Sequence, residues 1–433
     1  MSPQWVGILA FVALIGLIFA RVPVAVALLL VAGVGYAAID GVDTALTTLG
    51  TTPFDLAQAY SLSVVPLFLL MGIVVARTEI ARELYAAANA LFSGRRGGLA
   101  MATIGACAGF GAVCGSSLAT ASTMTQVSMP EMRRYGYPDA VACGVVASGG
   151  TLGILIPPSI VLVIYAIVAQ ESVPALFAAA LLPGLVLAAL HVGLIALLAT
   201  IRPQDYPVSP RANASERLVA VVRTWKMLLI FSVAVIGIYV GWFSPTEAAA
   251  VGAFLAILIG FVTRQLKLIA LWQAMRETVI VTGSLFVIAF GAFMFAYFVV
   301  QTRIPATLAE WVNGLAIAPT WVILFFVAIY LVLGCFLDTI SMLLITVPVF
   351  LPIAESLGYS PVWFGVLVVI VAEIGLITPP VGLNLFVIRA QQGDIALLDT
   401  YRGIVPFLAV HLANIGLLIA VPGLALWLPG WLY

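Results

Sequence analysis

Two adjacent prolines, Pro157 and Pro158, interrupt a long apolar run, and a second pair, Pro379 and Pro380, interrupts another such run 222 residues later. A proline inside a helix removes a backbone donor and clashes with the preceding turn, so each pair ends a helix. Hydrocarbon cannot hydrogen-bond the freed carbonyl groups, and a broken helix persists within a bilayer only where protein encloses it. The two pairs therefore limit the fold to one that surrounds both breaks.

The composition is that of a membrane protein. Hydrophobic residues make up 64% of the 433 residues and charged residues only 8%, with a mean hydropathy of +1.20. A soluble domain has about a quarter charged residues. We therefore predict an all-α polytopic membrane protein. The net charge is zero, and no basic block suggests nucleic-acid binding. The four cysteines lack metal-ligand spacing, and no arrangement of nucleophile and base indicates an enzyme.

Apolar runs of about 20 residues, the length that a spanning helix needs, predict ten crossings. These are 4–20, 24–39, 61–77, 138–168, 174–200, 227–243, 246–263, 279–300, 361–388 and 404–428. Two further apolar stretches, 99–129 and 321–353, have small and polar residues near their middle, and we predict that each is a re-entrant helical hairpin. Three amphipathic segments are typical of helices that lie in the membrane interface: 78–93, 264–277 and 305–318.

The basic residues orient these segments. With both termini outside and both hairpins re-entrant, 17 of the 18 Lys and Arg side chains fall on the cytoplasmic side, and only Arg303 falls outside. Cytoplasmic loops of membrane proteins carry such an excess of positive charge. A full crossing at 321–353 would instead put Arg389 and Arg402 outside, so the distribution favours the hairpin.

The chain contains two copies of one pattern. A shift of 222 residues places Pro130 on Pro352 and Gly153 on Gly375. Five crossings separate the two hairpins, so the second copy is predicted to be upside down in the membrane. The predicted parts are a first repeat (1–205, with scaffold 1–98, hairpin and broken helix 99–170 and closing span 174–200), a cytoplasmic linker (206–222) and a second repeat (223–433, with scaffold 223–320, hairpin and broken helix 321–392 and closing span 404–428).

Inverted repeats with paired broken helices are typical of secondary transporters that bind their substrate near the membrane midplane. One proline break alone would indicate a kink that only shapes packing. A pore would need a continuous polar path, whereas the polar residues here cluster at two paired breaks. The pattern therefore favours a transporter over a pore or a membrane scaffold.

The segments around the hairpins and breaks resemble those of a known family. The first set reads GSSLATASTMTQVSMPEMRRYGYPDA and SGGTLGILIPPS, and the second reads GCFLDTISMLLITVPVFLPIAESLGY and EIGLITPPVGLNLFV. Over the whole chain, these paired motifs resemble the large membrane subunit of tripartite ATP-independent periplasmic (TRAP) transporters. The resemblance implies an elevator-type, sodium-coupled importer of the ion-transporter superfamily, in the inner membrane of a bacterium or archaeon.

The resemblance also implies partners. These are a small four-helix membrane subunit and a periplasmic substrate-binding protein that delivers a small organic anion of the carboxylate class. Na⁺ would be the co-transported ion, and no organic cofactor is expected. The open alternative is a self-sufficient sodium- or proton-coupled anion symporter of the same superfamily, which would need no binding protein.

Each hairpin tip and its facing break offer oxygen atoms, which suit a hard cation. The resemblance implies that the first set is a sodium site: Gly115, Ser116, Ser117, Gly150, Thr151 and Pro157. A Ser-rich helix contact of the kind common in membranes is the alternative. An intramembrane carboxylate indicates function by default, and the second predicted sodium site contains two: Asp338, Thr339, Glu373, Gly375, Thr378 and Pro379. For Glu373, an internal ion pair or hydrogen bond is also open.

The substrate is expected between the two tips. Its predicted contacts are Ser116, Ser159, Asp338 and Asn384. No Lys or Arg lies at either tip, so an anion would depend on half-helix dipoles, hydroxyl groups and the bound cations. The binding protein would then supply much of the specificity, and the chain leaves the identity of the organic acid open.

Overall fold

The computed structural model describes residues 2–315 and 317–433. Its first half contains α1 (Pro3–Phe19), α2 (Val24–Asp40), α3 (Val42–Gln58), η1 (Tyr60–Ser63), α4 (Val64–Ala76), α5 (Ile80–Phe92), α6 (Gly98–Cys114), α7 (Ser117–Arg134), α8 (Asp139–Leu155), α9 (Ile160–Ala169) and α10 (Val173–Ile201). The linker contains α11 (Ala214–Arg223). The second half contains α12 (Trp225–Phe231), η2 (Ser232–Ile236), α13 (Gly237–Tyr239), α14 (Pro245–Val262), α15 (Leu268–Gln301), α16 (Ile304–Gly314), α17 (Pro319–Gly334), α18 (Thr339–Ser356), α19 (Pro361–Gly375), α20 (Leu383–Gln391), α21 (Leu397–Ala420) and α22 (Gly423–Leu432).

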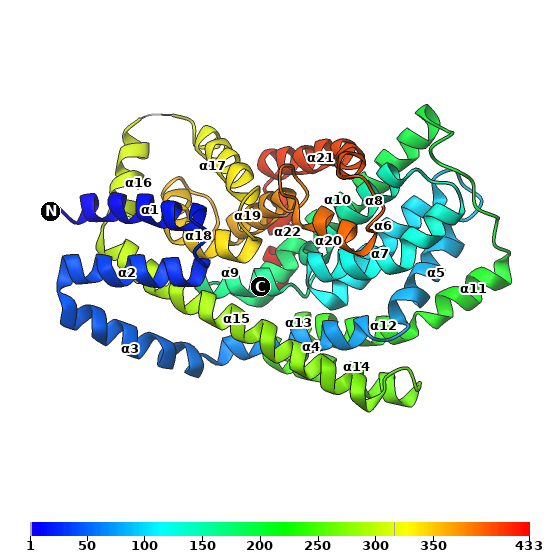
Figure 1. Cartoon of the computed structure of the whole chain (residues 1–433), viewed down its shortest axis with the longest axis horizontal. Coiled ribbons are helices and arrows are strands. Elements are labelled where there is room, and N and C mark those ends of the chain that lie inside the picture. Colours follow the sequence, from blue (N-terminus) through cyan, green and yellow to red (C-terminus); the bar gives the residue numbers. More distant parts are fainter. Residues whose placement is uncertain (1, 316) are drawn as a thin grey trace.

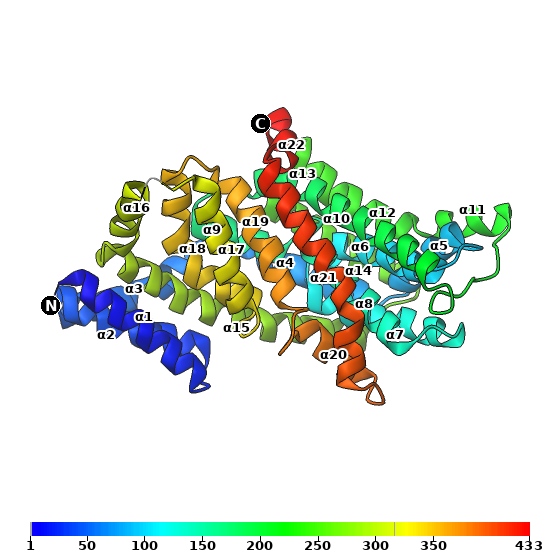
Figure 2. The same ribbon diagram turned by 90° about the horizontal axis from the view of Figure 1, so that it is seen from above.

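The helices are distributed along one long axis (Figure 1). The N-terminal helices and α16 lie at one end, whereas α5 and α11 lie at the other. The broken helices α8–α9 and α19–α20 lie between these ends, and Figure 2 shows the same order from above. The two halves meet there, because the Tyr165 hydroxyl of α9 donates a hydrogen bond to the Pro361 carbonyl of α19 at 2.6 Å.

The helix bounds repeat at the predicted spacing. Helices α7 and α18 are offset by 222 residues at both ends, and α8 and α19 begin at residues 139 and 361. Each half therefore contains a helical hairpin followed by an interrupted helix. We name the interruptions break 1 (156–159) and break 2 (376–382). The all-α architecture with two hairpins and two broken helices is confirmed, and the opposite orientation of the halves stays a prediction.

Helix α3 is absent from the predicted segments. Its threonines, Gly50 and Pro53 have weak helix propensity, which is why the sequence did not indicate it. Packing overrides this preference: Thr52 is buried, and its hydroxyl lies 3.4 Å from the Met294 sulfur of α15. Thr52 also donates to the Thr48 carbonyl at 2.7 Å, so its polar group is satisfied within the helix.

The predicted separation of an interfacial helix (264–277) from a crossing (279–300) is wrong, because α15 runs without interruption from Leu268 to Gln301. No proline or glycine lies at the junction, and Thr278 donates back to the Ala274 carbonyl at 2.8 Å. The corresponding part of the first half differs. There α3 and the η1–α4 helix are bent by 60°.

The predicted linker contains a helix that the sequence analysis did not identify, because α11 begins with a capping box in which Asn213 and Glu216 each accept a backbone hydrogen bond. This N-x-x-E pattern is a capping-box signature that predicts the start of a helix. The predicted span 404–428 is two helices, since α21 ends at Ala420 and Pro422 precedes α22.

Length and composition alone support fewer crossings than the sequence predicts. Among the described residues, five helices are long and apolar enough to span a membrane, and three bent helix pairs raise this number to eight. The five are α10, α14, α15, α18 and α21. Several other predicted crossings, such as α1 and α2, are apolar helices of 17 residues. Helix α18 belongs to a hairpin, so length by itself does not separate a crossing from a hairpin arm.

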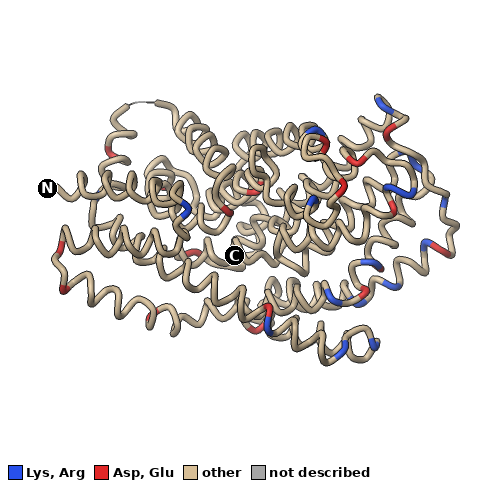
Figure 3. Tube along the Cα trace, viewed as in Figure 1, with Lys and Arg blue, Asp and Glu red and all other residues tan. Residues whose placement is uncertain are grey.

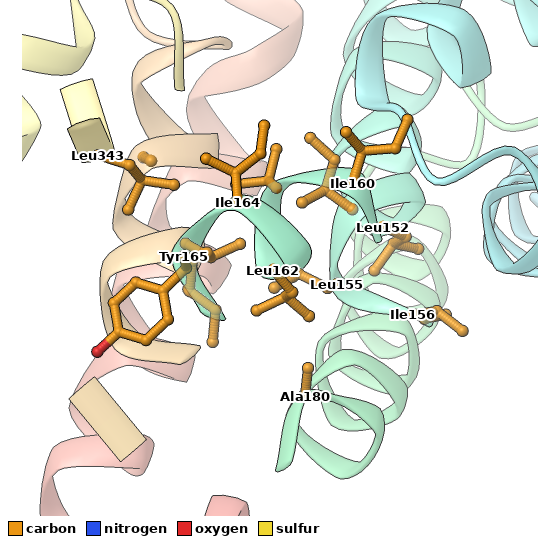
Figure 4. Close-up of a cluster of buried hydrophobic side chains, with 14 of the residues drawn as sticks. Leu152, Leu155, Ile156, Ile160, Leu162, Ile164, Tyr165, Ala180 and Leu343 are labelled. Atoms are coloured by element: carbon orange, nitrogen blue, oxygen red, sulfur yellow. The ribbon is translucent and has the colours of Figure 1, made fainter. Parts of the chain in front are cut away.

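Apolar side chains surround break 1 (Figure 4). Leu155 and Ile156 precede the two prolines, Ile160 and Leu162 follow them, and each is at most 5% exposed. Ala180 of α10 lies against this cluster. The interruption is therefore enclosed by protein, as a broken helix in a bilayer requires.

Helices α8 and α21 approach each other through glycines. A Cβ atom added at Gly403 of α21 would collide with the carbonyl oxygen of Ala140 on α8, and one added at Gly144 would collide with the Gly403 carbonyl. Larger side chains would separate the two backbones. The small residues thus hold α21 close to the broken helix.

The predicted orientation can be tested at two exposed positions. Lys and Arg residues gather toward the end of the molecule that carries α5 and α11 (Figure 3). We expect Ser215→Cys in α11 to react with an impermeant thiol reagent only from the cytoplasmic side, and Glu310→Cys in α16 only from outside. Ser209 is less suitable for labelling because it is buried. The unsubstituted chain is the control, since three of its four cysteines are buried. Reversed labelling would contradict the orientation.

Candidate functional site

Tip 1 (residues 115–117) connects α6 to α7 and contacts break 1. Gly115 adopts a left-handed conformation with φ +65°, and a Cβ there would lie 2.7 Å from the Pro158 carbonyl oxygen. Glycine is therefore required at this turn. Ser116 begins α7, and its hydroxyl accepts a hydrogen bond from the Ala119 backbone N–H at 3.4 Å. The Ile160 N–H of α9 donates to the Gly115 carbonyl at 3.5 Å, which joins the tip to the break.

Oxygen atoms of the first hairpin face α8. A Cβ at Gly153 would lie 2.5 Å from Thr120 Oγ1 and 2.9 Å from the Ser116 carbonyl oxygen. A Cβ at Gly150 would lie 3.3 Å from the Ser117 carbonyl oxygen. The hydroxyl of Thr120 is buried and has no hydrogen-bond partner among the described residues. The carbonyl groups of Ser116 and Ser117 and the Thr120 hydroxyl therefore lie against the surface of α8 that Gly150 and Gly153 form.

Tip 2 (residues 335–339) connects α17 to α18 and has a related contact with α19. A Cβ at Gly375 would lie 2.5 Å from the Gly334 backbone, so the two backbone segments are in contact at these glycines. Asp338 begins α18, and its Oδ2 accepts from the Ser341 N–H at 3.0 Å. The Cys335 thiol lies 3.7 Å from the Pro379 carbonyl oxygen. The second hairpin is therefore placed against break 2.

Both hairpins converge on Glu373 of α19. Its side chain is fully buried, and Oε1 accepts a hydrogen bond from the Thr339 hydroxyl of tip 2 at 3.2 Å. The Ser117 hydroxyl of tip 1 also lies beside this carboxylate. The other oxygen, Oε2, has no hydrogen-bond partner among the described residues. Among the residues that the structure describes, no Lys, Arg or His forms an ion pair with Glu373.

Asn384 of α20 extends this cluster to the first repeat. It is fully buried, and its amide donates to the Ala147 carbonyl of α8 at 3.4 Å. Its Oδ1 has no partner within the described ranges. The amide nitrogen would lie 3.3 Å from a Cβ at Gly150, so Asn384 sits against the surface that faces tip 1. Unpaired oxygens thus come from both halves.

Asp338 has a different environment. It lines an open cavity of about 490 Å³ between tip 2 and helices α2 and α15, together with Ser341 and Ser284. The Ser341 hydroxyl has no partner among the residues that the structure describes. Asp338 therefore lies at an open cavity beside the second hairpin, whereas Glu373 does not line this cavity and is fully buried.

The hydroxyl groups of three predicted residues form hydrogen bonds close to their own positions in the chain. The Thr151 hydroxyl donates to the Ser148 carbonyl at 2.6 Å and contacts His411. The Thr378 hydroxyl of break 2 donates to the Ile374 carbonyl at the end of α19 at 2.6 Å. Ser159 is fully buried and caps α9, accepting from the Leu162 N–H at 3.3 Å. Pro157 and Pro379 lie in the breaks themselves.

The structure also adds two residues to the predicted set, Thr120 and Cys335. Thr120 follows Ser116 by four residues, which places both on one face of α7. That spacing was a usable signal. Cys335 precedes the polar tip residues within an apolar stretch, and nothing in the sequence distinguished it from a core cysteine.

A sequence profile of the tripartite ATP-independent periplasmic transporters, DctM component, matches residues 11–424. The chain belongs to this family. It is 39% identical over 380 residues to a C4-dicarboxylate TRAP transporter large permease protein of Pseudomonas aeruginosa, with 88% of each chain covered. A sialic acid TRAP transporter large permease protein of Vibrio cholerae is 30% identical over 430 residues, covering 96% of each chain.

The fold also resembles that of a solved transporter. The YdaH transporter of Alcanivorax borkumensis matches with a TM-score of 0.64 over 88% of each chain, at 16% sequence identity. At this identity the likeness concerns the fold alone. The TRAP family assignment and the apolar helices make the protein a multi-pass transporter subunit of the inner membrane, and not an enzyme.

Proposed function

We propose that this TRAP large subunit couples the import of a small organic acid to an inward flow of sodium ions. One observation carries the proposal: Glu373 is a fully buried carboxylate that both hairpins approach, with one oxygen unpartnered among the described residues. A buried charge without a counter-ion is costly. A bound monovalent cation would neutralise the carboxylate and use the oxygen atoms around it.

The surrounding donor set suits sodium. Thr120 Oγ1 and Asn384 Oδ1 are buried oxygens without partners among the described residues, and carbonyl groups of Ser116 and Ser117 lie on the same side of α8. Hard cations prefer such oxygen ligands. The oxygen-lined surface between tip 1 and α8 corresponds to the first proposed site. Thr339 and Glu373 belong to the second, and Ser117 lies between the two.

Two of the relatives and the cavity at tip 2 support a carboxylate as the proposed substrate class. The two relatives named above are permeases for C4-dicarboxylates and for sialic acid, and both ligands contain carboxylate groups. We propose that a carboxylate substrate enters the cavity beside Asp338 after sodium has bound. The helix N-terminus at Ser116 would then favour the anion, and bound sodium would offset the negative charge of Asp338. A periplasmic binding protein would deliver the substrate, and a separate small membrane subunit would support the frame.

The movement that we propose is of the elevator type. The hairpins and broken helices (99–170 and 321–392) would form the moving part, and the scaffold segments (1–98 and 223–320) would form the frame. The contacts of each tip with its break lie entirely inside the proposed moving part. Cation ligands could therefore travel together with the substrate.

Transport by reconstituted proteoliposomes tests the proposal. The chain would be reconstituted with its small membrane subunit and its binding protein, and uptake of a labelled C4-dicarboxylate and of sialic acid would be measured. We expect uptake only with an inward sodium gradient and only with the binding protein present. Uptake driven by a proton gradient, or uptake without the binding protein, would support the self-sufficient symporter instead.

A further inference from the structure

Helices α10 and α21 bury two histidines that the transport proposal does not use. His191 and His411 are both fully buried, and their rings lie 4.9 Å apart in an edge-to-face arrangement. The Nε2 atom of His411 lies 3.3 Å from the Thr151 hydroxyl oxygen of α8. Neither ring nitrogen of His191 has a hydrogen-bond partner among the described residues. Only His411 is therefore linked to the broken helix.

The hydrogen bonds of Thr151 determine which atom of His411 carries the proton. A hydroxyl group has one hydrogen to donate, and a carbonyl oxygen can only accept. Because Thr151 donates its hydrogen to the Ser148 carbonyl at 2.6 Å, its oxygen is left to accept the bond from His411 Nε2 at 3.3 Å. His411 thus holds its hydrogen on Nε2 and acts as the donor.

Thr151 lies in the part of α8 that contacts the first hairpin. It lies between Gly150, which faces the Ser117 carbonyl, and Gly153, which faces the Ser116 carbonyl and Thr120. Glycine offers no side chain to fix the rotation of this part of the helix. The hydrogen bond between His411 and Thr151 would restrict this rotation from the side of α8 that faces away from the hairpin.

We propose that His411 is a positioning residue for the first cation site. By holding Thr151, it sets the rotation of residues 150–153 and hence the distance between α8 and the oxygen atoms of tip 1. His191 has no such role, although it has the same side chain and the same burial. The inference rests on the proposed sodium coupling for its transport readout.

Two ring-preserving substitutions separate the two histidines. We expect His411→Phe to raise the sodium concentration that gives half-maximal uptake by about two- to tenfold, the range that one hydrogen bond of ordinary net strength produces. The maximal rate at saturating sodium should change less. His411→Gln retains an N–H donor and should recover part of the sodium affinity. His191→Phe is the matched control and should leave the half-maximal concentration unchanged.

The outcomes distinguish positioning from packing. Equal effects of His411→Phe and His191→Phe, or an unchanged sodium requirement in His411→Phe, would overturn the proposal. If His411→Phe does not fold, Thr151→Val removes the acceptor from the other side and should raise the sodium requirement similarly. Where both single variants fold, the double substitution should add little to either of them.

A second measurement does not depend on sodium coupling. Hydrogen–deuterium exchange of residues 148–155 in sodium-free buffer should be faster in His411→Phe than in the unsubstituted protein, and unchanged in His191→Phe. If the unsubstituted protein transports without sodium, the proposed function fails, and this exchange experiment alone decides the anchoring role. Unchanged exchange in His411→Phe would reject that role even if transport is sodium-driven.

Discussion

Replacing Glu373 by glutamine should lower sodium-dependent uptake by at least about tenfold. The substitution retains the size of the side chain and its contact with Thr339, but it removes the negative charge that would hold the cation. Hydrogen bonds and contacts that involve a charged group are worth about 1.5–3 kcal/mol, or roughly 10- to 100-fold in binding. The measurement is initial uptake in proteoliposomes as a function of external sodium, at fixed substrate and binding protein.

The matched control for this substitution is Glu355→Gln, at the exposed end of α18. It removes the same charge outside the cluster and should leave the sodium dependence unchanged. Because Glu373 is buried without a basic partner in the described part of the chain, the glutamine variant should fold at least as well as the parent. A folded Glu373→Gln protein with the parent's sodium dependence would show that the cation binds elsewhere.

The substitution Gly403→Ala should destabilise the protein strongly. The added Cβ would collide with the Ala140 carbonyl oxygen of α8, and neither backbone can rotate away as a side chain could. Overpacking of this kind costs about 1–3 kcal/mol and occasionally more. We expect a lower midpoint of thermal unfolding in detergent and a reduced yield of folded protein.

Gly416→Ala on the same helix is the control, because nothing lies within 4 Å of the position of its Cβ. Alanine favours the helical state over glycine by up to about 1 kcal/mol, so this variant should be as stable as the parent or slightly more so. The two substitutions are chemically identical and should act in opposite directions. Equal midpoints would show that α8 and α21 do not pack as closely as the structure indicates.

The prolines and the small residues made most of the fold predictable. Their effects are local, so both breaks and both hairpin turns follow from the sequence without knowledge of the tertiary structure. Helix α3 was not predictable in this way, because its threonines and Pro53 argue against a helix and its packing against α2 and α15 stabilises it. The continuity of α15 was missed because amphipathic and apolar stretches were treated as separate elements.

The candidate site was predictable in its parts but not in its centre. Glu373 lies 34 residues from Thr339 and 256 from Ser117 in the sequence, and no local pattern indicates that all three meet. The direction in which the Thr151 side chain points could have been deduced from helix geometry. Residues 150 and 153 share one face of a helix, and residue 151 is about 100° away from the first of them. The same face therefore could not present all three to tip 1.

The uninterrupted course of α15 has an energetic consequence for the transport cycle. If the two repeats had the same shape, each could adopt the conformation of the other. The states open to opposite sides of the membrane would then have equal free energy. Here the first half bends by 60° between α3 and the η1–α4 helix, whereas its counterpart is one uninterrupted helix of 34 residues. The two end states are therefore not interchangeable, and the empty carrier should have a preferred resting side of the membrane even without any gradient.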